Sequence, residues 1–274
     1  MKVLFSLLDA PAPLNSKVAG YFGRVVGSLL MRKGNEMLQY FQQEGNDLLE
    51  KLIMHIDTTS VADVVKRMVG ADDGASVMPL PAMTQWLSET PLINLLLARL
   101  SSSHTAETQM NAADILTATA HSQPSPLAFK LSEHACVNAL MEYALAPGKQ
   151  VLVPALGVCI ALLEPQRPMI GDVAGASSLD LEQQESVLHA KNEAAAAIVL
   201  HLQPLVDMLH VDEGSEGKLE VSYGVLSPPL GSNRLKVGVL LNLFNPPSLS
   251  NPLEIISGRS AHRCTCALWV RGNN

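Results

Sequence analysis

Apolar side chains recur along most of this chain at steps of three and four residues, the spacing that places them on one face of an α-helix. The first clear example is the segment 15–33, whose apolar positions include Val18, Phe22, Val25, Val26, Leu29 and Leu30. Alternation with a period of two, which would indicate half-buried strands, does not dominate any long segment. The pattern therefore predicts an all-α chain.

Short polar segments rich in Gly, Pro, Asn and Ser separate the helical stretches. Their positions predict helices over 15–33, 35–41, 47–56, 61–69, 83–87, 92–100, 107–120, 128–131, 132–145, 151–163, 181–202 and 205–211. The same turn-forming residues predict loops over 71–81, 165–179 and 211–222. They also predict a turn segment over 223–233, which precedes an apolar run over 235–244.

Several helix starts carry capping residues. Asn15, Asn46 and Thr90 stand where an N-cap side chain is expected. Ser60 and Asp63 have the spacing of a capping box. These residues predict where four of the helices begin.

Helices of about 8 to 20 residues joined by short turns are typical of an α-solenoid or of a helical bundle. Pairs of predicted helices recur about every 40 residues, close to the repeat length of armadillo and HEAT arrays. No clean internal repeat accompanies this spacing. We therefore expect an α-solenoid of armadillo/HEAT-like stacked helix pairs, with a closed bundle as the alternative.

Composition and charge narrow the class of protein. Hydrophobic residues make up 47% of the chain and charged residues 16%, which predicts a folded globular domain. The net charge of -7 argues against nucleic-acid binding, because phosphate backbones need a basic surface. The longest apolar run, 151–163, is shorter than the roughly 20 residues of a membrane span. Cys136 and Cys159 lie in apolar helical stretches and are predicted to be buried thiols in a reducing compartment.

The sequence contains no residue set that predicts catalysis. The segment 214–218 (GSEGK) lacks the spacing of a phosphate-binding loop, and no Gly-x-Ser-x-Gly elbow occurs. His262, Cys264 and Cys266 have no fourth zinc ligand nearby. Asp and Glu residues do not cluster as a two-metal site requires. We therefore expect no enzyme activity, no cofactor and no metal.

Four methionines in the first quarter of the chain admit two interpretations. Met31, Met37, Met54 and Met68 lie in or next to predicted helices. We expect them to fill the core, with a methionine-rich binding groove as the alternative.

Several short segments stand out in order along the chain. They are SLL (6–8), PLN (13–15), GYF (20–22), MRK (31–33), YF (40–41), HIDTTSV (55–61), QWL (85–87), NAAD (111–114), LLEPQR (162–167) and GVLSPPLGSNRL (224–235). In this order and with these gaps they resemble the SAPS-domain family, the regulatory subunits of protein phosphatase 6, and are most similar to its plant-type members. The resemblance covers about residues 4–243, and segment 224–235 is its most specific part.

The resemblance implies a function. Members of this family are non-catalytic scaffold subunits that bind the catalytic subunit of a phosphatase-6-type Ser/Thr protein phosphatase and direct it to substrates. It also implies a holoenzyme of three subunits, one of which is an ankyrin-repeat protein. The expected location is the cytoplasm, with the nucleus as a second location. The alternative is a generic armadillo-like adaptor that binds a protein without any phosphatase.

Two departures from the family bear on domain organisation. Family members carry an acidic region before the first helix found here, and they continue with helices after Phe244. Here the segment 245–274 contains Pro, Ser, Gly and Arg without an amphipathic period. We therefore expect a partial SAPS-like helical-repeat domain over 1–244, truncated at both ends, and an irregular tail over 245–274 outside that domain.

The segment 223–235 is the predicted partner-binding site. Pro228 and Pro229, with Gly231, are expected to fix a turn that exposes Asn233 and Arg234. Arginine is enriched at interface hot spots. The alternative is that Arg234 pairs with a helix carboxylate.

Overall fold

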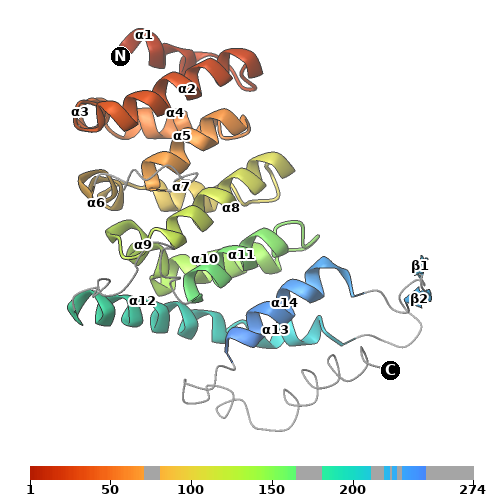
Figure 1. Cartoon of the computed structure of the whole chain (residues 1–274). Helices are drawn as coiled ribbons and strands as arrows, with labels where there is room; N and C mark the ends of the chain where they lie inside the picture. The colour runs from red at the N-terminus through yellow and green to blue at the C-terminus, as the bar shows by residue number, and fades with distance from the viewer. Residues whose placement is uncertain (71–80, 165–180, 211–218, 223, 227–229, 245–274) are drawn as a thin grey trace. The chain divides into compact units, whose positions relative to one another are not determined.

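A computed structural model describes residues 1–70, 81–164, 181–210, 219–222, 224–226 and 230–244. The chain divides into two compact units, Met1–Ile198 and Val199–Asn274. Helices make up most of the described residues of both units (Figure 1). The predicted all-α class is therefore confirmed.

The helices of the first unit follow one another in groups of three. Helices that are three apart in the chain contact each other, which produces three parallel series. The first series contains α2 (Ser16–Arg32), α5 (Thr59–Val69), α8 (Ala106–His121) and α11 (Leu152–Leu163). The second contains α3 (Gly34–Glu44), α6 (Pro81–Glu89) and α9 (Pro126–Ser132), and the third contains α4 (Asn46–Met54), α7 (Leu92–Ala98) and α10 (His134–Leu145).

The groups of three stack in chain order within this unit (Figure 1). The helices of the first series begin at Ser16, Thr59, Ala106 and Leu152, which are 43, 47 and 46 residues apart. Each group buries its apolar faces against the groups beside it, so the core is continuous along the stack. This arrangement confirms a helical solenoid, whereas its assignment to the armadillo or HEAT class stays a prediction.

Three further elements belong to the described part of the first unit. They are α1 (Lys2–Phe5), the 3₁₀ helix η1 (Ser6–Asp9) and α12 (Leu181–Val199). Helix α12 buries one narrow stripe, which includes Val187, Ala190 and Ala194 at steps of three and four residues. Its remaining faces are largely polar and exposed.

Aromatic side chains join the first two groups at the N-terminal end of the stack. The ring centroid of Phe5 lies 5.5 Å from that of Phe22, 5.2 Å from that of Tyr40 and 5.7 Å from that of Phe41. The ring of Phe41 lies 6.1 Å from that of Trp86, which comes from α6 in the second group. Such edge-on and offset contacts add to the burial of apolar area.

The predicted helix starts are correct in one case and wrong in three. Asn15 caps α2, because its side-chain oxygen accepts hydrogen bonds from two backbone N–H groups of the first turn. Helix α4 begins at Asn46 itself, and α5 begins one residue before Ser60. The hydroxyl of Thr90 donates instead to the carbonyl of Leu87, 2.7 Å away. A shift of one residue is enough to remove a cap, and hydrophobic periodicity does not resolve it.

In its described residues, the second unit contains two helices and a short hairpin. These elements are α13 (Leu202–Asp207), β1 (Leu219–Val221), β2 (Gly224–Leu226) and α14 (Gly231–Leu243). The strands are antiparallel and pair Leu219 with Leu226 and Val221 with Gly224. The predictions of a loop up to 222 and of a turn segment from 223 are wrong at these strands. Strands of three residues are too short to show a period of two.

Candidate interaction surfaces

The described part of the chain does not assemble a metal site. Within those ranges, no group of three His, Cys, Asp or Glu side chains lies close enough together to hold a metal ion. The tail residues His262, Cys264 and Cys266 lie outside the described residues. Among the described helices, none combines the length and the apolarity that crossing a bilayer would require.

Two cysteines are buried, as predicted. Cys159 of α11 is fully buried, and burial raises the pKa of its thiol to about 12. Burial also raises the pKa of Cys136, with a smaller contribution in the same direction from the charge of Glu133. A thiol attacks as its thiolate, which these environments disfavour at neutral pH. Neither cysteine is suited to act as a nucleophile.

The predicted partner-binding segment begins a helix. Asn233 and Arg234 lie in the first turn of α14, where both are half-buried, and Pro228 and Pro229 lie outside the described residues. The Nε of Arg234 donates to the carbonyl oxygen of Leu230 at 2.8 Å. The predicted turn segment is therefore wrong at residues 231–233, which are helical. Its residues 227–229 lie outside the described residues, and partner binding by this segment stays a prediction.

The start of α14 explains that correction. Gly231 has a φ of 70°, in the left-handed region that favours glycine, and it is the first residue of the helix. The helix therefore begins about one turn before the apolar run 235–244. Asn233 and Arg234 are presented by a helix, on which the guanidinium of Arg234 lies back over the first turn.

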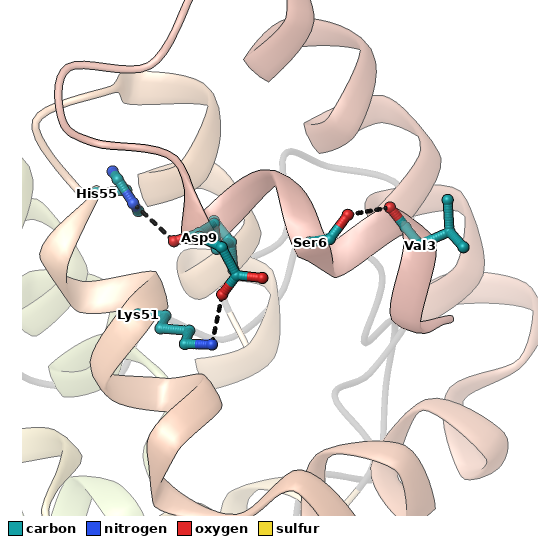
Figure 2. A network of polar contacts seen from close by, with 6 residues as sticks. Val3, Ser6, Asp9, Lys51 and His55 are labelled. Carbon is teal, nitrogen blue, oxygen red and sulfur yellow. Dashed lines mark hydrogen bonds and ion pairs between the residues drawn. The ribbon is translucent and has the colours of Figure 1, made fainter.

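A network of polar contacts holds the 3₁₀ helix η1 against α4 (Figure 2). The ammonium of Lys51 lies 2.5 Å from a carboxylate oxygen of Asp9, and this hydrogen bond raises the pKa of Lys51. The Nε2 of His55 lies 3.1 Å from the carbonyl oxygen of Leu8. Because a carbonyl only accepts, Nε2 must donate the hydrogen. His55 is fully buried, and its Nδ1 has no hydrogen-bond partner among the residues that the structure describes.

The residue after His55 receives a second long-range hydrogen bond. The side-chain nitrogen of Asn111, on α8, donates to the carbonyl oxygen of Ile56 at 2.7 Å. Asn111 is buried, and Ile56 lies in the turn between α4 and α5. Two segments singled out in the sequence, HIDTTSV and NAAD, therefore meet at one turn. Their contact joins neighbouring groups of helices.

One face of α2 exposes apolar side chains to solvent. Val18, Tyr21 and Val25 are 47%, 71% and 46% exposed and follow each other at three- and four-residue steps. Arg24 and Arg32 are also exposed, and neither forms an ion pair within the described residues. Tyrosine and arginine are enriched in protein interfaces. This face can bury apolar area and donate hydrogen bonds to another protein.

Residues 26–245 match the family model described as SAPS, SIT4 phosphatase-associated protein. The chain is 25% identical over 274 residues to serine/threonine-protein phosphatase 6 regulatory subunit 2 of Mus musculus, an alignment that covers 92% of this chain and 28% of the relative. It is 26% identical over 265 residues to regulatory subunit 1 of the same phosphatase and organism, covering 87% and 30%.

A yeast protein is similar over the same region. The extragenic suppressor of kinetochore protein 1 of Schizosaccharomyces pombe is 24% identical over 273 residues, which cover 92% of this chain and 32% of the relative. The chain thus spans less than a third of the length of these curated relatives. No solved structure matches it.

Proposed function

Because the chain belongs to the SAPS family of SIT4 phosphatase-associated proteins, we propose that it acts as a non-catalytic regulatory subunit. In this role it binds a Ser/Thr phosphatase catalytic subunit of the protein phosphatase 6 type and directs it to substrates. The observation that carries the proposal is the family match over residues 26–245. The similar proteins named as phosphatase 6 regulatory subunits support the identity of the partner.

The helical stack is suited to this role. Groups of three helices packed in series form a rigid scaffold whose surface can engage more than one protein. A scaffold that holds an enzyme and its substrate together raises the effective concentration of one near the other. Substrate choice then follows from where the scaffold places the substrate, and the chemistry is supplied by the catalytic subunit.

The resemblance to this family supports two finer proposals. The first is that the complex also contains an ankyrin-repeat subunit. The second is that the complex is present in the cytoplasm and, as a second location, in the nucleus. Mass spectrometry of the purified complex and fractionation of cells that express the tagged chain test these two points separately.

Co-purification tests the main proposal. The tagged chain is expected to recover Ser/Thr phosphatase activity from cells, together with a phosphatase-6-type catalytic subunit identified by mass spectrometry. The tag alone serves as the control. Recovery of protein partners without any phosphatase would favour the generic adaptor instead. Phosphatase activity of the chain purified without partners would contradict a non-catalytic role.

Single substitutions in the full-length protein test which surface engages the catalytic subunit. If the segment that contains Pro228, Pro229, Asn233 and Arg234 lies in the interface, Arg234→Ala should reduce recovery of the phosphatase about fivefold or more. Lys236→Ala, which removes another cation of the same helix, is the matched control. Unchanged recovery would remove this segment from the interface. The same assay with Tyr21→Ala tests the exposed face of α2.

A further inference from the structure

A serine-rich turn connects α7 to α8. It runs from Ser101 to His104, and the backbone N–H of His104 donates to the carbonyl oxygen of Ser101 at 3.1 Å. The side-chain nitrogen of Gln109, on α8, donates to the same carbonyl oxygen at 2.8 Å. Leu100, directly before the turn, is buried. These contacts fix the base of the turn, so that its tip is held at the surface.

The three serines of the turn differ in what their hydroxyl groups contact. The hydroxyl oxygens of Ser101 and Ser103 lie 3.1 Å apart and share a hydrogen bond. The hydroxyl oxygen of Ser101 also accepts from the backbone N–H of Ser103 at 3.4 Å. Ser102 is exposed, and its hydroxyl forms no hydrogen bond with any described residue. Of the three hydroxyls, that of Ser102 can therefore react without first breaking a contact.

Two basic side chains flank Ser102. Arg99 comes three positions before it and His104 two positions after it. Burial lowers the pKa of His104, and the positive charge of Arg99 lowers it further, which shows that these two side chains lie near each other. Arg99 is half-buried and forms no ion pair with a described residue. The helices that pack against α7 are mainly α4, α8 and α10, all of which the structure describes.

The position of Arg99 relative to Ser102 is unusual in this chain. Among the described residues, Ser102 is the one serine or threonine that has a lysine or arginine three positions before it. Protein kinases select their substrates by the charges around the acceptor hydroxyl. An arginine three positions before a serine is the pattern that arginine-directed Ser/Thr kinases recognise. The charge pattern and the free, exposed hydroxyl therefore point to the same residue.

We propose that Ser102 is phosphorylated by an arginine-directed Ser/Thr protein kinase, with ATP as the phosphoryl donor. The hydroxyl oxygen of Ser102 forms a bond to the γ-phosphorus of ATP. The bond from that phosphorus to the oxygen that bridges it to the β-phosphate breaks, and ADP leaves with the electron pair. The hydroxyl proton passes to a catalytic carboxylate of the kinase. This inference concerns a surface turn of the first unit and does not depend on the proposed function.

Phosphorylation of the whole chain tests the proposal. The chain is incubated with magnesium ATP and the catalytic subunit of cAMP-dependent protein kinase, an arginine-directed enzyme. Mass spectrometry of peptides identifies each phosphorylated position and its rate. Phosphate is expected on Ser102, and Ser102→Ala should lower phosphate incorporation into this turn about tenfold or more. Ser103→Ala, the matched control at the neighbouring exposed serine, should retain it.

A second set of variants tests the contribution of Arg99. Arg99→Gln should slow phosphorylation of Ser102 about tenfold or more, because the kinase loses a charge-assisted contact. Arg24→Gln, the same change at an exposed position of α2, should leave the rate unchanged. Arg99→Lys keeps the positive charge and should give an intermediate rate. Circular dichroism verifies that each variant remains folded.

Any of three outcomes would overturn the proposal. The first is that the unmodified chain carries no phosphate on Ser102 after prolonged incubation, a result that requires no substitution. The second is that Ser103 is phosphorylated as fast as Ser102. The third is that Arg99→Gln and Arg24→Gln are phosphorylated on Ser102 at equal rates.

Discussion

Among the glycines of α2, Gly23 lies closest to the backbone of α5. A Cβ added to Gly23 would lie 2.9 Å from the carbonyl oxygen of Ser60, which is shorter than a van der Waals contact. At Gly20, one turn earlier, the nearest atom is the hydroxyl oxygen of Ser60 at 4.0 Å. Glycine disfavours a helix interior. The helix crossing therefore explains the glycine at position 23, whereas it does not require one at position 20.

This difference predicts opposite effects for the same substitution. Gly23→Ala should lower the free energy of unfolding by about 1–3 kcal/mol, because the added methyl group pushes against backbone that cannot rotate away. Gly20→Ala should be neutral or raise it by up to about 1 kcal/mol, through better helix propensity. Urea unfolding followed by circular dichroism measures both. Equal effects at the two positions would contradict this account of the helix crossing.

Methionine burial shows what a residue type alone leaves open. Met37 and Met68 are buried, as predicted, but Met31 is 49% exposed and Met54 is 45% exposed. The prediction that all four fill the core is therefore wrong for two of them. Met31 and Met54 are the second-last and last residues of their helices. Successive residues of an α-helix are rotated by about 100°, so a residue that follows a buried one can point to solvent.

At the scale of elements, the turn between α4 and α5 is a joint between groups of helices. The ring of His55 donates a hydrogen bond to the carbonyl of Leu8. The carbonyl of the following residue, Ile56, accepts a hydrogen bond from the side chain of Asn111. A carbonyl in a buried turn loses its partners in water and must regain them within the protein. The side chain of His55, at the end of α4, supplies the donor for Leu8 of η1. The side chain of Asn111, on α8, supplies the donor for Ile56. The order of the groups along the stack is thereby specified by directional hydrogen bonds as well as by apolar packing.

Asn111 offers a test of this joint. Asn111→Ala should cost about 1–3 kcal/mol, because the carbonyl of Ile56 is left without a donor. Asn111→Asp should cost more, since it places a buried carboxylate against that carbonyl oxygen. Asn94→Asp, the same change at an exposed position of α7, should stay within about 0.5 kcal/mol of the unmodified protein.

Chemical denaturation of the three variants gives the comparison. The expected order of stability is Asn94→Asp first, Asn111→Ala second and Asn111→Asp last. If Asn111→Asp were as stable as Asn94→Asp, the hydrogen bond to Ile56 would not contribute to the fold.

At the scale of the whole molecule, the division into two units predicts independent folding of the first. A chain ending at Ile198 retains every described helix of the stack, apart from the last residue of α12. It should therefore melt cooperatively, with a midpoint within about 5 °C of the whole chain. Circular dichroism at increasing temperature measures this.

A shorter truncation provides the control. Residues 1–121 end after α8 and lack α11, which packs against α8 in the whole chain. Loss of that partner exposes an apolar face inside the stack. This shorter chain should melt at a lower temperature and less cooperatively than the chain ending at Ile198. The reverse order would contradict a continuous core along the stack.

Local features of the sequence predicted the helices well. A helix such as α2 or α8 is encoded by apolar residues three and four positions apart, which act within one segment regardless of the rest of the chain. The ordered short segments were also sufficient to indicate the family. The three-residue strands and the start of α14 were missed, because so few residues carry no resolvable period.

The sequence by itself determined the helical class, the family and the absence of any recognisable catalytic motif, since all of these depend on residue types and short spacings. Only the tertiary structure decided which helices contact each other and which methionines are buried. It also brought the side chain of Asn111 to the carbonyl oxygen of Ile56, 55 positions earlier in the chain. Burial and long-range hydrogen bonds depend on neighbours distant in the sequence, and folding alone places these together.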